Sequence, residues 1–133
     1  MYKPLPKKLT IRNSKIEGLG LFSEIMISKD SFIGVSHIKH DLFPNNYIRT
    51  PLGGFYNHSN SPNLIKLGSD TLPEFEFGKI LESNLILSKY KKSENKSKYL
   101  FLVSLKDINP GQELVAKYTF YEFWDNMKSY YEI

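Results

Sequence analysis

Three short groups of residues have types and spacings that chemistry could use. The first is the pair of glycines in Gly18-Leu19-Gly20, which lies in a turn between two extended segments. Glycine has no Cβ, so such a turn can bring backbone amides and carbonyls against a cofactor. A Gly-x-Gly pair also occurs in simple bends, and without a third glycine and a following helix it is no dinucleotide fingerprint. Both interpretations stay open from these residues alone.

The second group is a run of polar residues around His58, within GGFYNHSNSPN at residues 53–63. Apolar segments bracket this run, so its amides and hydroxyls are expected to form a buried or half-buried hydrogen-bonded knot. A functional site is one interpretation. The other is a structural turn in which His58 is a satisfied core histidine.

The third group is a turn at residues 109–111 and a strand that ends in Tyr118. A tyrosine at a strand end can hold its hydroxyl in a pocket while its ring is packed, although many such tyrosines only pack.

His37, His40 and Asp41 also lie close together in the sequence. The spacing His-x-x-His-Asp lacks a convincing fourth ligand, so we interpret them as solvent-exposed loop residues and expect no metal.

The elements that must position these groups are expected to be mostly strands. Alternating or apolar segments predict strands at residues 9–12, 31–38, 64–67 and 113–117. Two further apolar runs, at residues 80–87 and 99–105, flank a lysine-rich segment and are expected to be the arms of one hairpin. Proline, asparagine and paired glycines make residues 39–54 read as an irregular connection, and aromatic residues near helical spacing predict a short helix at 120–131.

The length of 133 residues supports one domain with a core, and the composition favours a mostly β fold. We expect a single domain with a basic N-terminal tail at residues 1–8 and an aromatic C-terminal segment at 119–133. The absence of cysteine excludes disulfides and thiolate zinc sites. The net charge of +4 leaves a small basic nucleic-acid-binding β domain as an alternative, although the basic residues gather where a solvated tail and loop are expected.

Together and in this order, the three groups resemble the SET-domain family of protein lysine methyltransferases, in its minimal, viral- or bacterial-type form. GLGLF at residues 18–22 is similar to the first motif of the family, and DSFIGV at 30–35 to the strand that follows it. NHS and PN within residues 57–63 resemble its most characteristic signature. PGQEL at residues 110–114, with Tyr118, resembles its closing motif. The resemblance covers nearly the whole chain.

The resemblance implies small curved sheets with a pseudoknot, in which the C-terminal motif threads the Asn57 segment, and a short C-terminal helix. It also implies S-adenosylmethionine as cofactor and S-adenosylhomocysteine as product, and methyl transfer of this kind needs no metal. On this model the backbone of Gly18, Leu19 and Gly20 holds the methionine part of the cofactor. Asn57 and His58 anchor its amino and adenine portions.

The same resemblance places a narrow channel for a substrate lysine opposite the cofactor. Phe32, which stands where some members carry a tyrosine, and Tyr56 would line this channel, and Tyr118 would sit where the methyl group crosses. Trp124 is similar to an aromatic residue that covers the adenine, or it packs on the core as an ordinary helix aromatic. Because the pKa of the Tyr118 hydroxyl is near 10 in its ordinary state, we expect it to orient the amine rather than act as a strong base.

Some features depart from the family pattern. Asn60 stands where many members carry cysteine, the segment between Val35 and Tyr56 is short, and Lys66 takes a position where some relatives carry an aromatic. The expected function is methyl transfer to the ε-amine of a lysine in a protein, with an inactive SET-like interaction module as another alternative. We expect a cytoplasmic location, the host cytoplasm for a viral source. The expected partner is a protein that presents a lysine; a homodimer is left open, and no membrane is expected.

Overall fold

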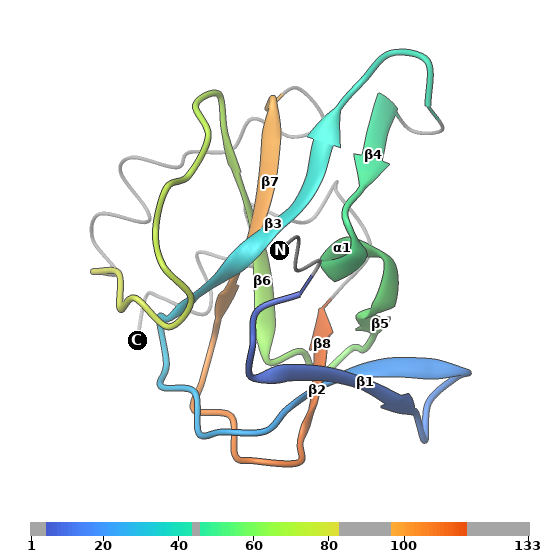
Figure 1. Ribbon diagram of the computed structural model, residues 1–133, viewed down its shortest axis with the longest axis vertical. Helices are drawn as coiled ribbons and strands as arrows, with labels where there is room; N and C mark the ends of the chain where they lie inside the picture. The colour runs from blue at the N-terminus through green and yellow to red at the C-terminus, as the bar shows by residue number, and fades with distance from the viewer. Residues whose placement is uncertain (1–4, 44–45, 83–96, 117–133) are drawn as a thin grey trace.

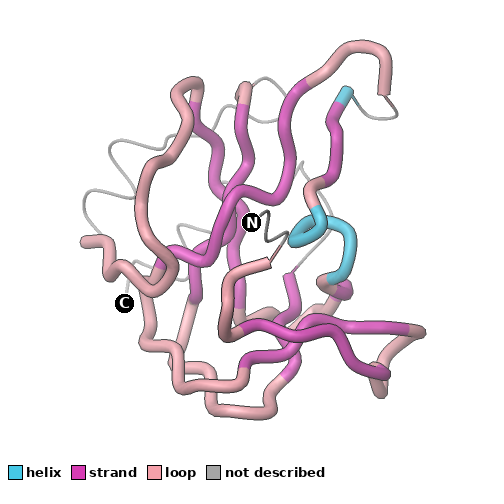
Figure 2. The backbone as a smooth tube through the Cα atoms, viewed as in Figure 1, coloured by secondary structure: helices cyan, strands magenta, loops and turns pink. Residues whose placement is uncertain are grey.

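The computed structural model describes residues 5–43, 46–82 and 97–116 of the chain, and their regular secondary structure is mostly β-strand. One short helix interrupts the strands (Figures 1 and 2). The elements in chain order are β1 (Leu9–Asn13), β2 (Leu19–Ser23), β3 (Phe32–Lys39), β4 (Tyr47–Arg49), α1 (Pro51–Phe55), β5 (Asn57–His58), β6 (Leu64–Ser69), β7 (Tyr99–Ser104) and β8 (Glu113–Ala116). No helix in these described ranges is long and apolar enough to cross a bilayer.

The strands form two small sheets of four strands each. One has the order β1-β2-β8-β5, and the other has the order β4-β3-β7-β6 (Figure 1). Every pairing is antiparallel except that of β5 with β8, which joins Asn57 to Val115 and His58 to Ala116 in parallel. Because β8 lies between β2 and β5, the last described strand connects the first hairpin with the polar motif from the middle of the chain.

Two apolar clusters form the core of the described residues, and one of them joins the two sheets. The larger one packs side chains of both sheets, among them Leu21, Ile33, Leu102 and Leu114, and all four are essentially inaccessible to solvent. The other cluster lies on the second sheet around Phe101 and Phe32, whose ring centroids are 5.7 Å apart. Burial of large apolar side chains from both halves of the sequence is the main stabilising contribution to a domain of this size.

The strands expected at the motifs are present within a residue or two, and the mostly β fold is confirmed. The expected hairpin between residues 80–87 and 99–105 is wrong. β7 pairs with β3 along one edge and with β6 along the other, so neither edge is free for residues 80–87. Where residues 80–82 are described, they form only an isolated bridge, between Ser31 and Ile80.

Residues 39–54 also differ from the expected irregular connection, since they contain β4 and most of α1. The helix begins after Thr50, whose hydroxyl accepts a hydrogen bond from the Gly53 amide at 3.2 Å, and Pro51 occupies the first helical position. Both are favoured helix-start features. The proline and glycines that read as turn signals therefore belong to a capped helical turn, which packs on β3. The expected C-terminal helix lies outside the described residues.

Candidate cofactor site

The glycine turn of the first motif joins β1 to β2 and projects from the first sheet (Figure 1). Gly18 adopts φ +48°, a left-handed conformation that glycine takes without strain, and a Cβ placed there would have no atom within 4 Å. Leu19 is 50% exposed. Gly18 and Leu19 are therefore open to solvent, whereas Gly20 is buried in β2. The carbonyls of Gly18 and Leu19 already accept one hydrogen bond each, from the Ser14 amide and from Asn57 Nδ2, and each keeps a second lone pair for a polar ligand group.

The Asn57 motif lies along β8 and wraps its end. Beyond the parallel pairing, the Ser59 amide donates to the Ala116 carbonyl at 3.1 Å. The Asn63 side chain takes both roles, accepting from the Val115 amide at 2.8 Å and donating to the Glu113 carbonyl at 2.8 Å. The predicted polar knot is thus present, and it is built around the closing strand. Asn57 and His58 are both half-buried at its start.

One side chain joins the three sequence motifs. Asn57 Nδ2 donates to Glu113 Oε2 at 2.7 Å and lies 3.2 Å from the carbonyls of both Glu17 and Leu19. These residues come from β5, from β8 and from the glycine turn. Residues that are 56 and 38 positions apart in sequence therefore meet at a single amide group.

Glu113 and Ser14 complete this contact, and neither was predicted as a site residue. The Ser14 hydroxyl donates to the Glu113 carboxylate, at 2.8 Å from Oε1 and 2.9 Å from Oε2. A Cβ on Gly20 would overlap that carboxylate, so the second glycine of the turn is needed for close approach. Nothing in the sequence pairs Ser14 with Glu113, because they are 99 residues apart. The spacing of the two glycines was the only signal of close approach.

Tyr56, predicted to line the lysine channel, is buried beside a group of polar side chains. Its ring centroid is 6.4 Å from that of His37, in an edge-on arrangement, and Lys66 Nζ lies 5.7 Å from the centroid of the Tyr56 ring. Burial, with a further effect of the Arg49 charge, lowers the pKa of Lys66 to about 8. Burial, together with the charges of Lys66 and Arg49, lowers the pKa of His37 to about 3, so this imidazole is neutral at pH 7.

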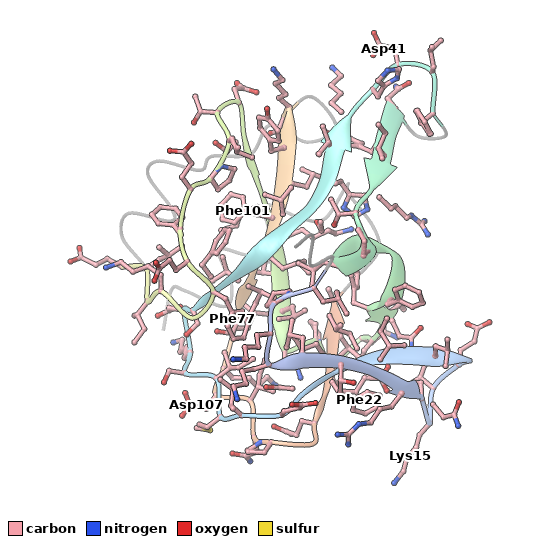
Figure 3. All side chains as sticks on the ribbon, viewed as in Figure 1. Lys15, Phe22, Asp41, Phe77, Phe101 and Asp107 are labelled. Carbon is pink, nitrogen blue, oxygen red and sulfur yellow. The ribbon has the colours of Figure 1, made fainter. Side chains whose placement is uncertain are left out.

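His37 corrects an expectation drawn from the sequence. We interpreted His37, His40 and Asp41 as solvent-exposed loop residues, but His37 is only 6% exposed; it belongs to β3, within the strand expected at residues 31–38. Its Nδ1 is 2.8 Å from the Ser36 hydroxyl. His40 and Asp41 do lie in the exposed loop after β3, with Asp41 near its tip (Figure 3). In the described part of the chain, no group of three or more His, Asp or Glu side chains is placed to hold a metal ion.

Phe32, the other predicted channel residue, lies away from Tyr56. It belongs to the second apolar cluster, whereas Tyr56 belongs to the first. Phe32 and His37 are five positions apart along β3, or roughly 16 Å at about 3.3 Å per residue. Phe32 instead lines an open groove with Val35, Phe75 and Phe77. The structure therefore does not bring the two predicted channel rings together. Tyr118 and Trp124 lie outside the described residues.

No protein-family model and no curated protein matches the chain. A crystal structure of a Plasmodium falciparum protein assigned as a histone methyltransferase matches 86% of this chain and 96% of its own, with 22% identity and a TM-score of 0.53. The chain has the SET-domain fold. Identity this low supports the fold and no more.

A second match lies within a much larger assembly. It is a humanised mutant of the Chaetomium thermophilum Polycomb Repressive Complex 2, in a structure with the inhibitor GSK343, at 17% identity and a TM-score of 0.54. The match includes 93% of this chain and 16% of that one. The same complex with the inhibitor GSK126 matches with a TM-score of 0.53. The described sheets thus correspond to one small part of the Polycomb chain.

Proposed function

We propose that this chain is an S-adenosylmethionine-dependent methyltransferase that modifies the ε-amine of a lysine in another protein. The observation that carries the proposal is the Asn57 amide, which contacts both the glycine turn and Glu113 of the closing strand. A SET-like fold alone would be compatible with an interaction module. A fold that also gathers its three motifs at one point, beside an open glycine turn, has the parts of a cofactor site.

The residues present suit the polar end of the cofactor. The bound cofactor would supply a methyl group on a sulfonium sulfur: a neutral amine would attack the methyl carbon to form a C–N bond, and the C–S bond would break to release S-adenosylhomocysteine. Backbone groups of the turn from Gly18 to Gly20 can pair with an amino-acid moiety, since each carbonyl keeps a second lone pair when one is in use. The half-buried Asn57 and His58 form β5, and only β8 lies between β5 and the strand β2 that follows this turn. The Glu113 carboxylate adds a negative charge close to where a cationic ligand would lie.

The surroundings of Tyr56 favour a lysine as the methyl acceptor. A free lysine with a pKa near 10.4 must lose a proton before it can attack, at a cost of roughly 4 kcal/mol at neutral pH. Lys66 is a lysine of this chain in that environment, and its pKa is lowered from 10.5 to about 8, chiefly by burial. A substrate amine that entered beside Tyr56 would gain from the same desolvation, because burial disfavours the charged form.

The exclusion of water would complete the chemistry. Methyl transfer to an amine is an in-line displacement, so the enzyme must align nitrogen, carbon and sulfur. It must also exclude water, whose hydrogen bonds would occupy the lone pair of the amine. Tyr56 is 4% exposed and packs with the main apolar cluster, which supports a dry acceptor site on its side of the fold. We propose that Tyr118 orients the amine and that Trp124 covers the adenine. Both roles rest on the resemblance of the sequence.

Two measurements test the proposal. Calorimetry of the purified chain with S-adenosylmethionine and S-adenosylhomocysteine should show binding, whereas a nucleic-acid-binding β domain would give no heat with either. Incubation with the methyl-labelled cofactor and a cell lysate should then label discrete protein bands, and mass spectrometry should place the label on lysine. Cofactor binding without any labelled protein would instead support the inactive interaction module.

A further inference from the structure

The Glu113 carboxylate lies at the junction of the three motifs, and both of its oxygens are in use. Asn57 Nδ2 donates to Oε2 at 2.7 Å, and the Ser14 hydroxyl is within 2.9 Å of both oxygens. Glu113 is partly buried at the start of β8. Hydrogen bonds to a charged group are the stronger ones in proteins, and they bring donors into fixed positions.

Ser14 extends this contact into the turn itself. The amides of Ile16 and Glu17 donate to the Ser14 hydroxyl oxygen at 2.9 and 3.3 Å, and the Ser14 amide donates to the Gly18 carbonyl at 2.8 Å. The serine therefore closes the turn from inside, while its hydroxyl hydrogen reaches Glu113. The other end is fixed by Asn57, which contacts the Leu19 carbonyl.

Glu113 is thus connected to both ends of the turn through two different side chains. The absence of a side chain on Gly20 admits the carboxylate, since a Cβ there would overlap it. Residues 15–19 are themselves exposed and gain little support from burial. Apart from the pairing of Leu19 with Asn13, their conformation depends on these hydrogen bonds, so the loss of the carboxylate should loosen the turn without disturbing the core clusters.

We propose that Glu113 is a positioning residue of the cofactor site, which acts through Ser14 and Asn57 to hold the glycine turn in its binding conformation. This inference rests on the proposed function. A ligand that needs an ordered turn binds more weakly when it must itself order that turn, because the binding-competent fraction multiplies the affinity. Glu113 would therefore determine cofactor affinity without contact with the reacting atoms.

The experiment compares Glu113→Gln and Ser14→Ala with wild type, and uses Glu24→Gln as the matched control. Glutamine keeps the size of the side chain but offers one acceptor oxygen and no charge. Glu24 is an exposed carboxylate at the other end of the same hairpin. The readouts are the Kd for S-adenosylhomocysteine by calorimetry, amide hydrogen exchange without ligand, and the KM for S-adenosylmethionine and kcat in the labelling assay.

For Glu113→Gln we expect a Kd and a KM for the cofactor at least tenfold higher, with kcat at saturating cofactor within about threefold of wild type. Amides at residues 16–20 should exchange faster, while those of β7 stay protected. Ser14→Ala should change the same quantities in the same direction by a smaller factor, and it also serves as the test should Glu113→Gln fail to fold. Glu24→Gln should match wild type in all of them.

An unchanged Kd and unchanged exchange at the turn in both variants would overturn the inference and leave the proposed function standing. Equal loss of protection in the turn and in β7 would also overturn it, because that result indicates general destabilisation. Failure of the wild-type chain to bind either cofactor form would instead remove the proposed function. The faster exchange expected at residues 16–20 could still be measured, since it needs no ligand.

Discussion

Lys66 Nζ lies 5.7 Å from the centroid of the Tyr56 ring, in a position where both side chains are only 4% exposed. The charged form of a lysine in such a place is stabilised by the aromatic face, which attracts cations, and destabilised by burial, which disfavours charge. The burial effect is the larger, since the pKa of Lys66 falls to about 8. The amine therefore titrates close to physiological pH, and the stability of the fold depends on pH through this region.

The first prediction concerns Lys66 and alkaline stability. The unfolded chain holds this proton up to a pKa near 10.4, while the folded chain releases it near 8, so stability rises with pH between these values. We expect a gain of roughly 2 kcal/mol in unfolding free energy between pH 7.5 and 9.5 in wild type, and its loss in Lys66→Met. Urea unfolding of both proteins across this range is the measurement; parallel curves would contradict the assignment.

The second prediction concerns His37 and the stability of the fold at acidic pH. Its pKa is about 3 in the folded chain and near 6.5 when unfolded, so the unfolded state binds the proton first and stability falls as pH drops below 6.5. From pH 7 to pH 5 this group alone should remove roughly 2 kcal/mol. His37→Gln should have a shallower pH dependence over that interval by urea denaturation. An identical slope would mean that His37 is protonated in the fold or is not buried.

The third prediction uses the close approach of Gly20 and Glu113. Gly20→Ala places a methyl group on the carboxylate, so we expect loss of cofactor affinity and a fall in unfolding free energy of roughly 1–3 kcal/mol. In a Glu113→Ala background the same change should cost clearly less, because the overlapping atoms are gone. A double-mutant cycle by thermal unfolding measures this coupling. Additive effects would show that the two residues do not meet.

The fourth prediction rests on the sequence. If Tyr118 orients the acceptor amine, Tyr118→Phe should reduce turnover to near background while the Kd for S-adenosylhomocysteine stays within about twofold of wild type. Calorimetry and methyl labelling on one preparation provide both numbers. Wild-type activity in the phenylalanine variant would refute the role of the hydroxyl.

The fifth prediction concerns the pH dependence of the reaction. An amine acceptor reacts only when neutral, so the labelling rate at saturating cofactor should increase between pH 7 and pH 9. The rate profile of a lysine-containing lysate substrate provides the test, with protein stability checked at each pH. A rate that falls over this interval would argue against an amine as the nucleophile.

The sequence alone was sufficient for the elements that carry local signals. The strands at Leu9, Leu64 and Glu113 follow from alternation and β-rich composition, and the polar knot around His58 follows from the crowding of amides between apolar segments. The hairpin assigned to residues 80–105 was wrong because strand partners were assumed to be neighbours along the chain. The actual partners of β7 are β6, which lies about thirty residues earlier, and β3, which lies earlier still, and only the assembled sheet shows them.

Within the site, what could not be predicted were the contacts between distant residues. In the sequence, Ser14 looks like an ordinary turn serine and Glu113 like one position of a motif. Neither pattern indicates that the two side chains are in contact. His37 looked exposed because it is polar and close to a loop, whereas the second sheet buries it against Tyr47 and Tyr56. The separation of Phe32 from Tyr56 follows from the length of β3. The sequence predicts that strand but not which of its residues packs beside Tyr56.

The place of β8 between β2 and β5 has a consequence for the order of events during synthesis. β8 belongs to the last twenty described residues, yet it is the strand against which the glycine turn and the Asn57 motif are assembled. A nascent chain that has emerged only as far as β7 can begin to form the second sheet, but it lacks the strand that joins the first hairpin to β5. Contacts of such high sequence separation form slowly, because a long loop must close first. Competence to bind the proposed cofactor should therefore appear abruptly, and only after β8 has left the ribosome.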